Sequence, residues 1–276
     1  MFSLRLYKIL VLCPIWIQYG IVRVKRWLCL NGDEYTVDLI ILFFIGLFAT
    51  TLGTLAGGGG LISLPAMLTI GVPVHSAIGA NKVANTISSL SGFFAIYRNK
   101  GVSLEEGFKV IPISLLGGAT GGWLATIITP DIMYKIAICL LIFAFLFSFV
   151  GKSDFSGDEK FRLRAKGSPL LYGIGIYDGV FGPGQATLML YLFSYMKISY
   201  YRAVGLTRIA TFSSCFGASI SYIASGQIIW PLTIALMLGS LSGAQIGVRL
   251  AEKLKRKHVK SLLRLVTLAL IISLLF

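Results

Sequence analysis

Two glycine-rich breaks interrupt apolar stretches of this sequence, and each would leave backbone amides free to bind a ligand. The first is Gly57 to Pro65, GGGGLISLP, within an apolar run that begins near Val37 and continues past Met67. Four consecutive glycines disfavour a helix, because each lacks side-chain packing and leaves a mobile backbone. A second break, Gly182-Pro183-Gly184, interrupts another apolar run, and Pro183 suits the first turn of a new helix.

The two breaks predict an anion-binding pocket inside a membrane. In lipid, non-helical backbone is tolerated only where protein buries it or a watery cavity receives it. The half-helices that would follow, from about Leu61 and from Gln185, would direct free amides and the positive ends of their dipoles at that pocket. A second interpretation fits the glycines alone equally well: small residues let helices pack closely.

Ionisable side chains lie next to both breaks. Asp178 is the one acid within an apolar span, in GIYDGVFGPG, where an acid is costly and commonly functional. The alternative is a helix-end acid that caps amides or pairs with a base. Lys82 and Arg208 occupy matching positions in GANKVAN and GLTRIAT. They could attract an anion, or could extend to the membrane surface.

The candidate substrate-binding residues belong to the two breaks and to the spans that follow them. They are Gly57, Gly58, Gly59, Gly60, Leu61, Asn81, Lys82, Asn85, Gly182, Pro183, Gly184, Gln185, Thr207, Arg208 and Thr211, with Asp178 as the candidate for ion coupling. The Asn and Thr side chains could donate hydrogen bonds to oxyanion oxygens, or could simply bridge helices.

Other chemistries find little support in the sequence. No Gly-Lys-Ser/Thr follows GGGG, so the first break is not a Walker A phosphate loop. The four cysteines and two histidines lack metal-ligand spacing. We therefore predict no cofactor, no metal and no catalytic residue.

The composition indicates a polytopic helical membrane protein in contact with the lipid bilayer. The chain has 276 residues, of which 56% are hydrophobic and 13% charged. Several stretches reach the roughly 20 apolar residues that span a bilayer. The net charge of +14 would also suit nucleic acid, but the bases cluster in loops between spans. A positive-inside signal explains them better, so we expect an all-α fold and no nucleic-acid partner.

The chain divides into two transmembrane repeats with an extension and a linker. The predicted parts are a basic and apolar extension at 1–35, a first repeat at 36–151, a cytoplasmic linker at 152–168 and a second repeat at 169–276. The first repeat has a broken element at about 37–71 and spans at 75–97, 107–128 and 133–150; the second has a broken element at 169–197 and spans at 200–224, 228–251 and 259–276. The run at 9–22 fits an in-plane helix or an extra tilted span.

The repeat rests on one offset and on the placement of charge. A shift of 126 positions superimposes Ala77-Ile78-Gly79 on Ala203-Val204-Gly205, and the GxxxG pair at Gly117 and Gly121 on Gly243 and Gly247. If each broken element re-enters the membrane, the four most basic loops fall on one face. This predicts inverted repeats with the breaks near the midplane, as in many secondary transporters.

The motifs around both breaks resemble one transporter family. AGGGGLISLP followed by GVPVHSAIGANK, then YDGVFGPG followed by AVGLTR, is similar to the TauE/SafE family, often called sulfite exporters, over about residues 37–276. The resemblance implies a multi-pass carrier in the bacterial cytoplasmic membrane for sulfite, thiosulfate, sulfoacetate or related anions. It also implies ion coupling, with the proton as one candidate.

This sequence departs from the family pattern at two places. Members often have an acid shortly before the first glycine run, where this chain has Gly53-Thr54, so any coupling role would rest on Asp178. A small residue usually follows the second GPG, where this chain has Gln185.

We therefore predict a non-enzymatic secondary carrier, a probable exporter, of a small sulfur-containing anion. One repeat would rock against the other to give alternating access. The alternatives are an anion channel, which would favour an open pore, and an intramembrane enzyme or assembly factor. The latter would be expected to show paired acids or His and Cys ligands, where the sequence offers Asp178.

Overall fold

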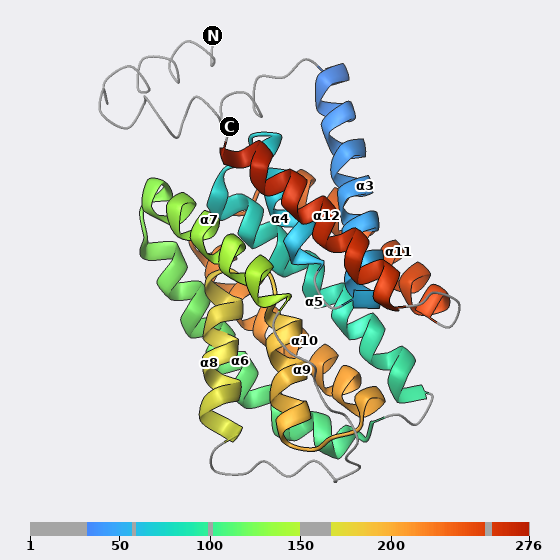
Figure 1. Ribbon diagram of the computed structural model, residues 1–276. Helices are drawn as coiled ribbons and strands as arrows, with labels where there is room; N and C mark the ends of the chain where they lie inside the picture. The colour runs from blue at the N-terminus through green and yellow to red at the C-terminus, as the bar shows by residue number, and fades with distance from the viewer. Residues whose placement is uncertain (1–31, 57–58, 99–101, 150–166, 252–255, 276) are drawn as a thin grey trace.

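The computed structural model describes residues 32–56, 59–98, 102–149, 167–251 and 256–275, and all regular structure within these ranges is helical (Figure 1). The helices are α3 (Gly32–Ala56), α4 (Gly60–Thr69), α5 (Val74–Arg98), α6 (Leu104–Ile127), α7 (Pro130–Phe147), α8 (Gly167–Val180), α9 (Gln185–Tyr195), α10 (Tyr200–Ala224), α11 (Trp230–Ala251) and α12 (Arg256–Leu275).

The helix order confirms the all-α prediction and most of the expected boundaries. The six predicted full spans correspond to α5, α6, α7, α10, α11 and α12, and each broken element is a pair of helices, α3 with α4 and α8 with α9. Within the described ranges, the segments Thr36–Thr54, Leu104–Ile127 and Pro130–Phe147 are long and apolar enough to cross a membrane. The predicted extension up to residue 31, Gly57, Gly58 and most of the predicted linker lie outside the described residues.

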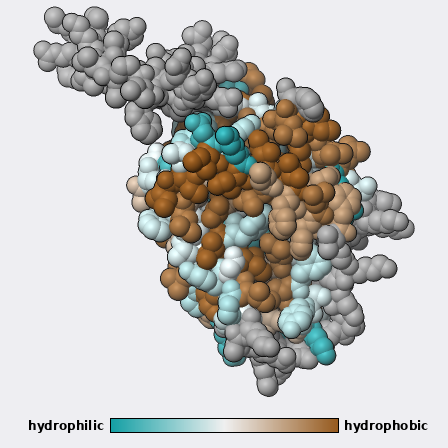
Figure 2. Space-filling view, turned by 60° about the vertical axis from the view of Figure 1, so that its left-hand side comes forward, coloured by the Kyte–Doolittle hydropathy of each residue, from teal (hydrophilic) through white to brown (hydrophobic). Residues whose placement is uncertain are grey.

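The surface suits a lipid environment. Large apolar side chains such as Phe44, Phe48, Trp123 and Leu146 are each more than 45% exposed. Figure 2 shows apolar residues over much of the visible face, with polar residues scattered between them. A soluble protein rarely exposes so much contiguous apolar surface. The fold is that of a membrane protein.

Glycines bring the longest helices into close contact. A Cβ atom at Gly117 of α6 would lie 2.6 Å from the Tyr172 carbonyl oxygen of α8, and Gly121 meets the next turn of α8 in the same way. Gly243 of α11 packs against the backbone of Leu47 in α3. The close-packing interpretation therefore describes these GxxxG pairs well.

The helix contacts follow a two-fold pattern. α6 packs on α8, and α11, its counterpart under the predicted repeat, packs on α3. Between these pairs α5 and α10 lie antiparallel, because Gly79 packs beside Tyr222 while Gly205 packs beside Ile96. In Figure 1, α8 and α9 occupy the lower half of the molecule and α4 the upper half. Inverted repeats would likewise place the corresponding short helices α4 and α9 in opposite halves of the molecule. The repeat itself stays a prediction.

Candidate functional site

The two breaks meet inside the helix bundle. A Cβ atom at Gly60 would lie 3.3 Å from the Cα atom of Pro183, so the start of α4 touches the turn before α9. A pocket with about 790 Å³ of empty space, its open mouth included, lies at this junction. Its lining residues are Thr50, Gly53, Thr54, Gly59, Gly60, Asn81, Asn85, Ser89, Asp178, Gly182, Gly184, Gln185, Ala186, Leu190, Tyr200, Val204, Thr207, Arg208 and Thr211.

Most of the predicted site residues come together in this pocket. Gly59, Gly60, Asn81, Asn85, Asp178, Gly182, Gly184, Gln185, Thr207, Arg208 and Thr211 all line it. Three other predicted residues do not: Leu61 is buried in the apolar core, Pro183 belongs to the turn behind the lining, and Lys82 lies beside Asp178.

Sequence reasoning missed part of the lining, although helical spacing could have found some of it. Ser89 continues the face of α5 that carries Asn81 and Asn85, at intervals of four residues. On α10, Tyr200 and Val204 precede Arg208 at the same interval of four residues, and Thr207 is adjacent to Arg208. In α3 the sequence predicted no site residue from which helical spacing could extend to Thr50, Gly53 and Thr54.

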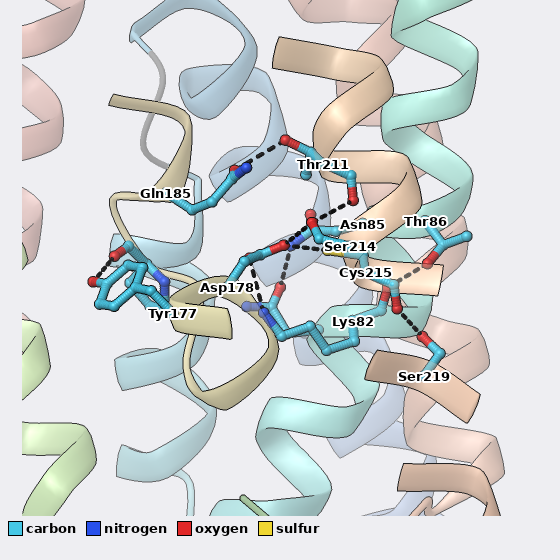
Figure 3. Close-up of polar contacts among 12 residues, drawn as sticks. Lys82, Asn85, Thr86, Tyr177, Asp178, Gln185, Thr211, Ser214, Cys215 and Ser219 are labelled. Atoms are coloured by element: carbon cyan, nitrogen blue, oxygen red, sulfur yellow. Dashed lines mark hydrogen bonds and ion pairs between the residues drawn. The ribbon is translucent and has the colours of Figure 1, made fainter. Parts of the chain in front are cut away.

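A buried ion pair joins α5 to α8 at the edge of the pocket. Lys82 Nζ lies 3.0 Å from Asp178 Oδ1, and the two side chains are 1% and 4% exposed. Ser214 donates a hydrogen bond to Asp178 Oδ2, and Cys215 Sγ lies 3.4 Å from the same oxygen (Figure 3). Of the two interpretations of Asp178, the structure has the acid paired with a base. Lys82 does not reach the membrane surface, and its charge is balanced by Asp178.

Gly182 lets the backbone of the second break approach this ion pair. Its φ is +101°, which favours glycine, and a Cβ atom there would collide with Lys82 Nζ and lie 2.9 Å from Asp178 Oδ1. Glycine at position 182 therefore lets the backbone of the second break pack directly against the Lys82–Asp178 pair.

Arg208 has no such balance. Its side chain is partly buried in the pocket wall, where its Nε would lie 3.4 Å from a Cβ atom at Gly92 of α5. Among the residues that the structure describes, no carboxylate pairs with Arg208. The pocket therefore holds one uncompensated positive charge.

Three buried polar atoms of the lining also lack a hydrogen-bond partner within the described ranges. They are Thr54 Oγ1, Thr207 Oγ1 and Gln185 Nε2. Thr211 donates to Gln185 Oε1 at 2.9 Å, which leaves the NH₂ group of this amide to face elsewhere (Figure 3). An unsatisfied buried polar group costs about 1–3 kcal/mol, which a bound acceptor such as an oxyanion would recover.

The local structure of the second break corrects two details of the prediction. Pro183 lies in the turn before α9, and Gly184, with φ +86°, is the residue that caps the helix. The Gln185 amide donates to the Gly182 carbonyl oxygen at 3.0 Å, so Gln185 offers the pocket its side chain and not its backbone. The hydrogen bond within the tight turn occupies this amide, which no local sequence pattern predicted.

No group of three His, Cys, Asp or Glu side chains is close enough to hold a metal ion in the described part of the chain. What the pocket offers is a cation, hydroxyl and amide donors, and a neighbouring ion pair. Groups of these kinds, brought together in one pocket, could bind a small oxyanion.

Comparison with known proteins gives one consistent result. The family model described as "Sulfite exporter TauE/SafE" matches residues 42–274. The chain is 33% identical to the "Probable membrane transporter protein ORF9" of a Sinorhizobium species, over 86% of this chain and 92% of that protein. It is 32% identical to a "Probable membrane transporter protein" of Haemophilus influenzae, over 78% and 86% of the two chains. It is 26% identical to the "Probable membrane transporter protein YfcA" of Escherichia coli, over 86% and 89%. No solved structure matches the chain significantly.

Proposed function

Because the chain belongs to the sulfite exporter TauE/SafE family of membrane transporters, we propose that it is a secondary transporter of a small sulfur-containing anion such as sulfite or an organosulfonate. The proposed location is the bacterial cytoplasmic membrane and the proposed direction is export. The sulfur chemistry rests on the family description, and the anionic character rests on the pocket.

One observation carries the anion-binding assignment: among the described residues, Arg208 has no carboxylate partner, and it lies in a pocket where three buried polar atoms have no hydrogen-bond partner. An RSO₃⁻ or sulfite group presents three oxygens around one charged centre. Arg208 would supply the opposite charge, and Gln185 Nε2 with the hydroxyls of Thr54 and Thr207 would donate hydrogen bonds. Charge-assisted hydrogen bonds of this kind are about twice as strong as neutral ones.

The position of the pocket suits alternating access. Its walls come from both halves of the chain, with α3, α4 and α5 on one side and α8, α9 and α10 on the other. A rocking motion of one half against the other would therefore open and close it. The Lys82–Asp178 pair crosses the same boundary, so protonation of Asp178 would weaken a bond between the halves. This is our proposed route for coupling to protons.

Uptake into proteoliposomes tests the proposal. We expect saturable uptake of radiolabelled sulfite by the purified protein, and at least a tenfold loss of uptake in Arg208→Gln. The matched control is Lys109→Gln, because Lys109 is exposed and pairs with Glu105 on the outer face of α6. Uptake that is unchanged in Arg208→Gln, while the variant inserts normally, would remove the anion-pocket assignment.

The same measurement separates the alternatives. A channel would give flux that does not saturate with anion concentration. An intramembrane enzyme would convert a substrate without accumulating it in the vesicle. No specific observation favours the channel or the enzyme. Counterflow of labelled against unlabelled sulfite would be a property of a carrier alone.

A further inference from the structure

The two broken elements, α3 with α4 and α8 with α9, correspond to each other when the sequence is shifted by 125 positions. The spans that follow them correspond at a shift of 126 positions. α4 begins at Gly60 after its capping residue Gly59, and α9 begins at Gln185 after Gly184, which is 125 positions later in both cases. The glycine contacts give the same spacing: Gly117 meets the Tyr172 carbonyl, and Gly243 meets that of Leu47. α4 has 10 residues and α9 has 11, which accounts for the change to 126 afterwards.

This spacing identifies the counterpart of Asp178 as Gly53. The counterpart of Lys82, at the spacing of 126 that holds for α5 and α10, is Arg208. In one half the cation therefore has a carboxylate partner, 3.0 Å away. In the other half the position of that carboxylate holds a glycine, and no carboxylate of the described ranges pairs with the cation.

The glycine that replaces the carboxylate and the cation opposite it belong to the same pocket. Gly53 and Arg208 both line it, as do Thr54 and Thr207, whose hydroxyls lack partners among the described residues. Lys82, whose charge is balanced, does not line it. When Lys82 is counted with the lining, the charged groups among the described residues of the site are two cations and one acid. The net charge of the site is one positive charge.

We propose that the acidic group of the transported anion takes the place of the missing carboxylate beside Gly53 and Arg208, so that the pocket selects anions with a single negative charge. This inference rests on the proposed function and specifies its substrate class: monoanions such as alkylsulfonates and hydrogensulfite, in preference to dianions such as sulfate. A second negative charge in the pocket would have no cation to balance it, and an uncompensated charge in a partly desolvated site is costly.

Two substitutions of Gly53 separate charge from size. In Gly53→Asp a carboxylate beside Arg208 would occupy the place of the anion, and we expect uptake of radiolabelled methanesulfonate to fall at least thirtyfold. Gly53→Asn has nearly the same shape and no charge, so it measures the steric effect of the side chain alone, and we expect Gly53→Asp to lose at least tenfold more uptake than Gly53→Asn. Equal losses in Asp and Asn variants that both insert normally would show a steric effect and overturn the charge argument.

Competition experiments on the unmodified protein test the inference without any variant. Methanesulfonate should inhibit sulfite uptake at a concentration at least tenfold lower than sulfate, at a pH where sulfate is a dianion. Equal inhibition by the two ions would refute selection for a single charge while leaving the carrier function intact. Absence of uptake for every sulfur anion would instead refute the proposed function, and the inference with it.

Discussion

Removal of one member of the Lys82–Asp178 pair should destabilise the protein far more than removal of both. The pair is almost fully buried, with side chains 1% and 4% exposed. Lys82→Met would leave Asp178 with Ser214 and Cys215 but without a cation. Asp178→Leu would leave Lys82 charged in an apolar interior. In the double variant Lys82→Met/Asp178→Leu neither of these two buried charges remains.

The magnitudes follow from burial. Breaking a buried ion pair by removing one partner typically costs about 3–5 kcal/mol, because the remaining charge is uncompensated. Asp178→Leu also removes the carboxylate acceptor of the Ser214 hydroxyl and leaves it the Thr211 carbonyl oxygen at 3.3 Å, so this loss adds at most about 1 kcal/mol. Replacement of both partners by apolar residues is often close to neutral. We therefore expect a coupling energy of about 3 kcal/mol or more between the two sites.

The assay is reversible unfolding of the purified protein in mixed detergent micelles, followed by circular dichroism, for the two single variants and the double variant. Lys109→Met is the control, because the exposed Lys109–Glu105 pair should contribute less than about 0.5 kcal/mol. If the double variant is as unstable as the sum of the single variants, the two residues are independent. The pair would then not be the bond between the halves that the coupling proposal requires.

Three further predictions concern packing, and the same unfolding assay checks each. Gly118→Val should cost about 2–3 kcal/mol or prevent folding, because a Cβ atom there would collide with the backbone of α10. Gly173→Ala is the control: it has open space around it and should be neutral or slightly stabilising. Similar costs at both positions would contradict the packing argument. Gly184→Ala should cost about 1–2 kcal/mol because φ is +86°, and an unaffected variant would mean that this turn is conformationally free. Arg264→Ala should lose about 1–2 kcal/mol, because its guanidinium donates a hydrogen bond to the Ser148 carbonyl oxygen and lies 4.0 Å from the centre of the Phe149 ring. Arg264→Lys should recover part of this loss. No loss in either variant would exclude these contacts as a source of stability.

The helices were predictable from the sequence because apolar length and glycine breaks are local signals. GGGG and Gly-Pro-Gly interrupt helices wherever they occur, and the six following spans are delimited by polar or proline-containing turns. The site was predictable only in part. Spacing placed Asn81, Asn85, Thr207 and Arg208 on facing helices, and the structure brings them to one pocket.

The remaining features depend on contacts between distant parts of the chain. The pairing of Lys82 with Asp178 joins residues 96 positions apart, and no local pattern indicates which cation an acid will meet. The lining residues of α3 became evident only because the fold brings them to the same pocket as the second break. The lack of a carboxylate at Gly53 is visible in the sequence, but its consequence for Arg208 required the one-residue difference between α4 and α9.

The central claim is that an anion binds where the two breaks meet, and its most direct test is a crystal structure of the protein with bromomethanesulfonate, whose bromine gives an anomalous signal. We predict a single peak in the pocket, with the sulfonate oxygens within hydrogen-bond distance of Arg208 and of Gln185 or Thr207. A peak outside this pocket, or a well-ordered structure with transport-competent protein and no peak at a saturating concentration, would contradict the account.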